Sequence, residues 1–109
     1  MNTIKEISSY ETICIVKPDL NEDNIAKIIE TYQLMLVEKG AQNIVTQNRG
    51  RRHLNYTTKQ FKDGIYIQMN YASNGEVISL LEKNMRIDEQ VLRFMTVKNH
   101  VKDKAAITV

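Results

Sequence analysis

Hydrophobic and polar residues follow two different periods in the first part of the chain, and each period predicts a different element. Residues 10–16 are mostly apolar and β-branched, which predicts a central strand buried on both faces. From Ile25 to Leu36 the apolar residues recur at helical spacing, which predicts an amphipathic helix. Asn21 is placed to cap this helix and Gly40 to end it. A strand followed by a helix therefore opens the chain.

Two extended segments come next, joined by a polar connection. Residues 43–54 begin apolar and become polar, and residues 65–70 alternate apolar and polar side chains with the period of a strand. The polar residues 55–63 lie between them. The pattern predicts an antiparallel hairpin with a long, mobile tip.

A second helix and a final strand complete the pattern. Ser73 or Asn74 can cap the helix, and its apolar stripe fades near Asn84. Residues 91–97 are again mostly apolar and predict a closing strand. Three methionines are predicted to fill the core: Met69, Met85 and Met95. The order β-α-β-β-α-β predicts an α+β, ferredoxin-like fold, with a four-stranded antiparallel sheet and both helices on one face.

Length and composition limit the possible architectures but identify no activity. At 109 residues, with ordinary apolar and charged fractions, the chain is predicted to form one domain over residues 1–100, followed by a flexible tail at 101–109. Its apolar runs are all far shorter than the roughly 20 residues that span a bilayer, which predicts no membrane association. Residues 1–6 resemble neither a signal peptide nor a transit peptide, so we expect the protein to work in the compartment where it is made.

Residue types with catalytic or metal-binding chemistry are few and scattered. Cys14 lies in an apolar run and is predicted to be a buried core residue. His53 and His100 lie far apart, without neighbouring metal ligands. Of the two acid pairs, residues 22–23 suit the start of a helix and residues 88–89 a solvated turn. Without a phosphate-binding loop or a nucleophile motif, the sequence predicts no enzyme activity, cofactor, metal site or small-molecule substrate.

Positive charge is segregated along the chain, although the net charge is only +2. Six cations and no acid lie between Glu38 and Asp63, so the rest of the chain carries a net charge of −4. The six are Lys39, Arg49, Arg51, Arg52, Lys59 and Lys62. Such segregation is typical of a nucleic-acid-binding surface.

The centre of this segment predicts either a contact surface or a solvated strand edge. On a strand, Arg51 and His53 point to one side, while Arg52 and Leu54 point to the other. Arginine suits phosphate oxygens, and Tyr56 can stack on a base or pack on a sugar. The alternative is an edge strand that its charges protect from aggregation. Composition alone leaves both interpretations open.

Further cations flank the predicted final strand. Arg86, Arg93 and Lys98 are either single surface charges or part of one face with the hairpin arginines. Residues 64–70 lack the aromatic pattern on which RNA-recognition motifs of this topology stack bases. Open-faced binding of single strands is therefore disfavoured.

Four stretches together resemble one family, the bacterial-type ribosomal protein number six of the small subunit. They are Tyr10-Glu11, Gly50-Arg51-Arg52-His53-Leu54-Asn55-Tyr56, Tyr66-Ile67-Gln68-Met69-Asn70 and the segment from Arg86 to Lys98. The similarity extends from about Tyr10 to His100, with the elements in the same order. One departure is that Thr57-Thr58 stands where the family usually has Pro-Ile.

The resemblance implies a ferredoxin-like, non-enzymatic constituent of the small ribosomal subunit. It implies binding to the central domain of 16S ribosomal RNA together with the eighteenth small-subunit protein. Arg51, Arg52 and Tyr56 carry over directly from the matching hairpin motif. The candidate RNA- or partner-binding residues are then Arg49, Arg51, Arg52, His53, Tyr56, Lys59, Arg86, Arg93 and Lys98.

The abundance of asparagine, isoleucine and lysine resembles proteins from AT-rich genomes. Together with the missing transit peptide, it favours a plastid-encoded protein, as in a red-algal lineage, on ribosomes of the chloroplast stroma. A cyanobacterial or other bacterial cytoplasm is the alternative. The alternative function is a ferredoxin-like, homo-oligomeric regulator that binds a small ligand between subunits.

Overall fold

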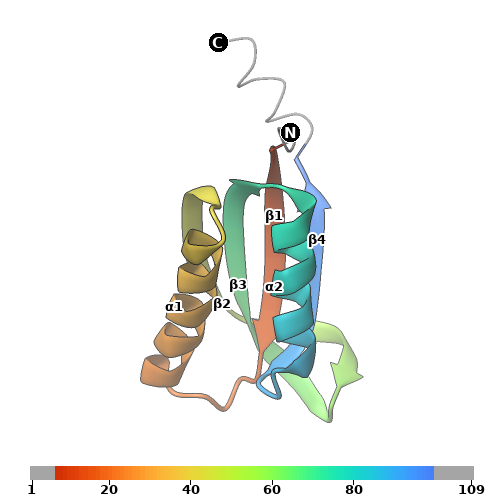
Figure 1. Ribbon diagram of the computed structural model, residues 1–109. Helices are drawn as coiled ribbons and strands as arrows, with labels where there is room; N and C mark the ends of the chain where they lie inside the picture. The colour runs from red at the N-terminus through yellow and green to blue at the C-terminus, as the bar shows by residue number, and fades with distance from the viewer. Residues whose placement is uncertain (1–6, 100–109) are drawn as a thin grey trace, which may run out of the picture.

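The computed structural model describes residues 7–99, which form strands and helices in the order β-α-β-β-α-β (Figure 1). The elements are β1 (Ser8–Val16), α1 (Glu22–Glu38), β2 (Gln42–Thr58), β3 (Phe61–Ser73), α2 (Gly75–Ile87) and β4 (Val91–Lys98). The predicted ferredoxin-like fold is confirmed. The predicted tail at 101–109 and His100 lie outside the described residues, so the division into domain and tail stays a prediction.

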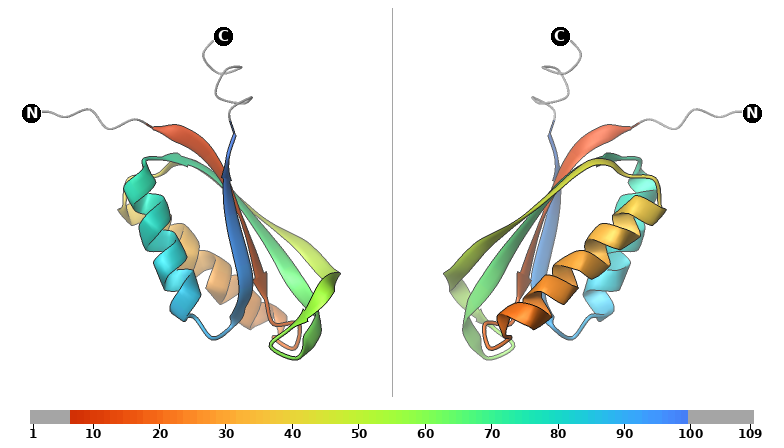
Figure 2. Two further views of the ribbon diagram at one scale, coloured as in Figure 1. Left: turned by 90° about the vertical axis from the view of Figure 1, so that its right-hand side faces the viewer. Right: turned by 90° about the vertical axis from the view of Figure 1, so that its left-hand side faces the viewer.

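The four strands form one antiparallel sheet in the order β2-β3-β1-β4. β1 lies between β3 and β4, as its apolar sequence predicts for a central strand, while β2 and β4 form the two edges. Both helices cover one face, and the sheet twists so that the end of the β2–β3 hairpin swings away from them (Figure 2). The opposite face, called the outer face below, is not covered by either helix.

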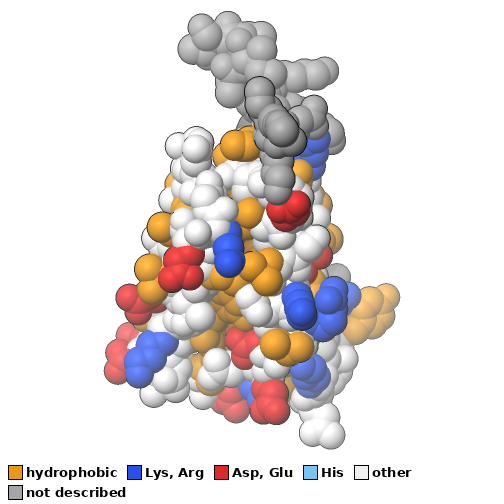
Figure 3. Space-filling view, in the orientation of Figure 1, with side chains coloured by type: hydrophobic (Ala, Val, Ile, Leu, Met, Phe, Trp, Pro, Cys, Tyr) orange, Lys and Arg blue, Asp and Glu red, His pale blue; other side chains and the backbone are white. Residues whose placement is uncertain are grey.

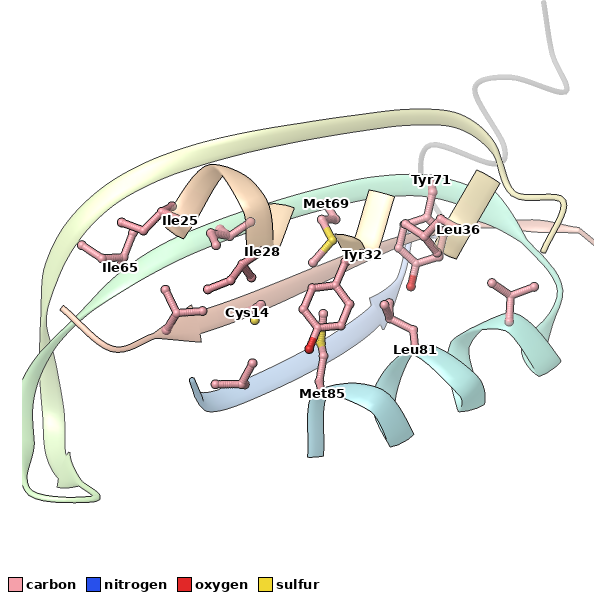
Figure 4. Packing of buried hydrophobic residues seen from close by; sticks show 14 residues of the cluster. Cys14, Ile25, Ile28, Tyr32, Leu36, Ile65, Met69, Tyr71, Leu81 and Met85 are labelled. Carbon is pink, nitrogen blue, oxygen red and sulfur yellow. The ribbon is translucent and has the colours of Figure 1, made fainter. Parts of the chain in front are cut away.

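The main core lies between the helices and the sheet (Figure 4). The helices contribute Ile25, Ile28, Tyr32 and Leu36 from α1, and Val77, Leu81 and Met85 from α2. Cys14 of β1 is fully buried among them, and burial raises the pKa of its thiol to about 12. Because only a thiolate is a good nucleophile, Cys14 serves as the packing residue that the sequence predicts.

Asparagine side chains cap both helices. Asn21 Oδ1 accepts a hydrogen bond of 2.8 Å from the backbone N–H of Asn24. Asn74 Oδ1 accepts hydrogen bonds from two N–H groups in the first turn of α2, so Asn74 and not Ser73 is the cap. Gly40 has a φ of 90°, the left-handed conformation that commonly ends a helix. The predicted boundaries of α1 are therefore correct.

Two of the three predicted core methionines are buried. Met69 is 0% exposed, and Met85 is 1% exposed because α2 continues past Asn84 and extends its buried stripe. The prediction for Met95 was wrong, since this side chain is 59% exposed. Met95 pairs with Ile13 in the register of β4 with β1, which places it on the outer face. Met95 therefore adds exposed apolar surface to the outer face.

The β2–β3 hairpin ends in a tight turn instead of the long, mobile tip predicted at residues 55–63. β2 continues to Thr58 and β3 begins at Phe61, so only Lys59 and Gln60 lie in the turn. Their φ angles are 49° and 72°, and two successive positive φ values are typical of a type I′ turn. The prediction was wrong because such turns usually carry Asn-Gly or Asp-Gly, which this sequence lacks here.

Asp88 is not the solvated turn residue that the sequence predicts. It is only partly exposed, and its Oδ2 accepts a hydrogen bond of 2.8 Å from the Tyr32 hydroxyl. Its Oδ1 accepts a hydrogen bond of 3.0 Å from the backbone N–H of Gln90. Burial raises the pKa of Tyr32, and the interaction with Asp88 raises it further. Asp88 thus ties the α2–β4 turn to α1.

Candidate binding surface of the hairpin and the outer face

Irregularities in β2 set the directions of the hairpin side chains. The register with β3 shifts between Asn48 and Gly50, and again between His53 and Thr58. At the first shift Gly50 adopts a φ of 90°, and its N–H donates a hydrogen bond of 2.8 Å to Asn48 Oδ1. Between the shifts, residues 51–53 pair regularly with β3, so their side chains alternate between the two faces.

Arg51 and His53 lie on the same side of β2, where both contact Asp63 of β3. Nε and Nη2 of Arg51 donate to Asp63 Oδ2 at 3.4 and 3.2 Å. Because a carboxylate only accepts, Nδ1–H of His53 donates to Oδ1 at 2.9 Å. Arg49 lies outside this group and donates to Gln47 Oε1 at 3.0 Å. The hairpin therefore folds an acid onto the predicted basic cluster and partly neutralises it.

The pKa of Asp63 is lowered from its ordinary value of 3.8 by the hydrogen bond from His53 and the interactions with Arg51. A lowered folded-state pKa stabilises the fold above the unfolded-state pKa, and this contribution is lost as the pH falls through the lowered value. We predict that an NMR titration of the Asp63 carboxyl has its midpoint below 3.8, and that His53→Ala raises this midpoint. A midpoint that His53→Ala leaves unchanged would show that the hydrogen bond is not formed in solution.

Arg52 and Leu54 point to the outer face, as the alternation predicts. The guanidinium carbon of Arg52 lies 5.6 Å from the centre of the Tyr66 ring, a cation–π geometry. Leu54 is 5% exposed and packs with Ile15 in a second, smaller core on this face. Two adjacent arginines thus lie in different environments, since Arg51 contacts a carboxylate and Arg52 an aromatic ring.

A groove of about 650 Å³ crosses the outer face beside Arg52. All four strands contribute to its lining, which consists of Ile13, Ile15, Arg52, Leu54, Asn55, Tyr56, Tyr66, Arg93, Phe94 and Met95. Tyr56 is the most open of these aromatic rings, with 75% of its surface exposed. The lining contains aromatic, aliphatic and arginine side chains but no lysine and no acid. We call this surface the outer-face groove.

The fold brings some of the predicted cations together and separates others. Arg52 and Arg93 both line the outer-face groove. Arg93 also lines a smaller pocket at the start of β4, together with Lys59 and Arg86. Lys98 lies at the other end of β4 and lines neither of these two sites. The nine candidate residues therefore do not form one continuous patch.

Seven of the ten residues that line the outer-face groove were not predicted as site residues from the sequence. Tyr66 alternates with buried isoleucines in residues 65–70, and that period places it on the outer face. Met95 gave no such signal, because a mostly apolar edge strand has the pattern of a core element. Phe94 lines the groove but pairs with Cys14 and packs against the main core, so the apolar pattern was a correct guide to it. Only the pairing of β4 with β1 identifies which of its side chains remain uncovered.

Residues 7–99 hold no group of three or more His, Cys, Asp or Glu side chains that could bind a metal ion. Among the same residues, neither α1 nor α2 has the length and apolar character required to cross a membrane.

The sequence is similar to proteins described as ribosomal protein S6, named bS6 or bS6c. Residues 9–98 match the family model described as ribosomal protein S6. A small ribosomal subunit protein bS6c from Guillardia theta is 59% identical over 91 residues, covering 84% of this chain and 95% of that protein. A bS6c from Porphyra purpurea is 46% identical over 99 residues, covering 91% and 88%. A bS6 from Trichormus variabilis is 45% identical over 103 residues, covering 91% and 95%.

The fold matches a solved structure as well. The crystal structure of 30S ribosomal protein S6 from Thermotoga maritima superposes with a TM-score of 0.87, covering 94% of this chain and 97% of that one. The two sequences are 21% identical, so this comparison bears on the fold alone.

Proposed function

Because the chain belongs to the ribosomal protein S6 family, whose members are structural proteins of the small ribosomal subunit, we propose that it binds 16S ribosomal RNA there together with the eighteenth small-subunit protein. It acts by positioning RNA and protein, without catalysis. The RNA region is the central domain that the family resemblance implies.

The composition of the outer-face groove is the main support for binding of a partner protein. Protein interfaces are enriched in arginine, methionine and aromatic residues and depleted in lysine and acids, and the groove lining has this composition. Tyr56 and Met95 supply exposed apolar surface, while Arg52 and Arg93 supply hydrogen-bond donors. We therefore assign the groove to the partner protein.

Exposed side chains outside the groove bind the RNA. Arg49, Arg51 and His53 are exposed along the hairpin, and Lys98 is exposed at the far end of β4. A net charge of +2 supports only a few phosphate contacts, so the RNA affinity depends on the partner completing the surface. The protein thus works as one half of a composite RNA-binding unit.

The proposed location is the ribosome of the chloroplast stroma, with a cyanobacterial cytoplasm as the alternative. Support comes from the bS6c relatives in the algae Guillardia theta and Porphyra purpurea. The bS6 relative in Trichormus variabilis supports the alternative. Localising the tagged protein in cells of the source organism decides between the two.

Titration of a 16S central-domain fragment at physiological salt, with and without the eighteenth protein, tests the proposal. We expect saturable binding of this chain only when the eighteenth protein is present, because the chain alone has few cations free for phosphate. A different result would favour the alternative function, a homo-oligomeric regulator. In that case the chain would bind neither the RNA fragment nor the eighteenth protein, and it would sediment as a symmetric oligomer that a small ligand stabilises.

A further inference from the structure

We infer that Lys59, Arg86 and Arg93 form a phosphate-binding pocket that holds one backbone phosphate of the ribosomal RNA. The inference rests on the proposed function and adds a defined RNA contact to it. The pocket has a volume of about 300 Å³ and lies where the hairpin turn, the end of α2 and the start of β4 meet. The rest of its lining is Met85, Val91, Leu92 and Phe94.

Two of the cations are held in place by contacts of their own. Lys59 lies in the type I′ turn, and its Nζ donates a hydrogen bond of 3.2 Å to the backbone carbonyl of Val91. The guanidinium carbon of Arg86 lies 5.5 Å from the centre of the Phe94 ring. A contact with a ring is not a hydrogen bond to an acceptor, so the N–H groups of Arg86 remain available to a phosphate. Lys59 likewise keeps donors beyond the one used on Val91.

The pocket carries three positive charges and no acid in its lining. Within residues 7–99, no carboxylate forms an ion pair with any of these three side chains. Like charges in one pocket repel each other, and a bound anion relieves that repulsion. A phosphodiester, with its charged oxygens, is an anion of the right chemistry.

The pocket adjoins the outer-face groove, because Arg93 and Phe94 line both. Figure 3 shows Lys and Arg side chains gathered over the lower part of α2 and β4, beside an apolar protrusion at the edge of the molecule. An RNA phosphate in the pocket would therefore lie next to a partner protein in the groove. Because the pocket and the groove adjoin, we expect binding of the RNA to depend on the partner protein.

A charge-matched pair of double variants tests the pocket. Lys59→Gln with Arg86→Gln removes two of its cations and leaves Arg93 for the groove. Lys62→Gln with Lys83→Gln removes two exposed cations from the same hairpin and the same helix, outside the pocket. Each variant is titrated into the complex of the central-domain RNA fragment with the eighteenth protein, over a range of salt concentrations.

We expect the pocket variant to bind about tenfold more weakly and the control variant less than about threefold more weakly. The slope of log affinity against log salt should become shallower by roughly 0.7 to 0.9 for the single phosphate contact that is lost. Equal losses in the two variants would overturn the pocket, because general charge would then account for them.

Two further outcomes have separate meanings. If the pocket variant weakens the binary complex with the eighteenth protein when RNA is absent, the pocket holds an acidic group of that protein and the phosphate assignment is wrong. If the unsubstituted chain does not bind the RNA–partner complex at all, the proposed function fails instead. Thermal melting checks both double variants for folding, and Lys59→Gln alone, at an exposed turn, repeats the test if the double variant unfolds.

Discussion

Arg52→Ala is expected to weaken binding of the eighteenth small-subunit protein by about 30-fold or more, whereas Arg51→Ala weakens it by no more than about threefold. Arg52 lies over the Tyr66 ring in the outer-face groove, where a docked partner removes it from water. Truncating an arginine of this kind typically costs about 2 kcal/mol or more. Arg51 is 61% exposed and already paired with Asp63 at 3.2 Å, and an exposed pair contributes roughly 0 to 1 kcal/mol.

Calorimetric titration of the two purified proteins measures both effects. The two variants lose the same charge from adjacent positions of one strand, so long-range electrostatics change equally in both. Arg52→Lys keeps the charge but loses the planar guanidinium that lies over the Tyr66 ring, and we expect it to show most of the same loss in affinity. Similar losses for Arg51→Ala and Arg52→Ala would mean that hairpin charge, and not the groove, binds the partner.

Gly64→Ala is expected to destabilise the fold by roughly 1 to 3 kcal/mol. Gly64 is buried in β3, and an added Cβ would overlap Cγ2 of Ile15 and lie 3.4 Å from the carbonyl oxygen of Val16. Ile15 belongs to the central strand and is β-branched, so neither its backbone nor its Cγ2 can move aside freely. Thermal unfolding should show the melting temperature falling by roughly 4 to 8 °C for each kcal/mol lost.

Gly75→Ala is the matched control for this substitution. Gly75 is the first residue of α2, and an added Cβ there would have no heavy atom within 4 Å. Alanine is also the better helix former, so its melting temperature should stay the same or rise slightly. A melting temperature for Gly64→Ala equal to that of Gly75→Ala would show that β1 and β3 separate easily enough to accept the methyl group.

The sequence predicted the element order, the α1 caps and the opposite directions of Arg51 and Arg52 because all three depend on neighbours a few positions away. It did not predict the hairpin turn. Lys59-Gln60 carries no glycine or asparagine, and its positive φ values are imposed by the pairing of the strands on either side.

The binding surfaces depend on register between distant segments, which no local pattern contains. Asp63 pairs with Arg51 only because the hairpin joins the strands that carry them. Lys59 reaches Val91, a residue 32 positions away, only because the turn folds against the start of β4. Met95 is exposed because β4 pairs with β1 at an edge where no helix covers its outer side.

The periodicity of the chain by itself determined a ferredoxin-like sheet with a hairpin of basic residues, because hydrophobic spacing fixes elements and the faces they bury. The tertiary structure decided which of those basic residues are free. Charge is a property of each residue, but its neutralisation depends on what the fold places within a few ångströms of it. In the folded protein, the single basic hairpin of the sequence therefore has a partly neutralised side at Asp63, contributes Arg52 to the outer-face groove and contributes Lys59 to a separate basic pocket.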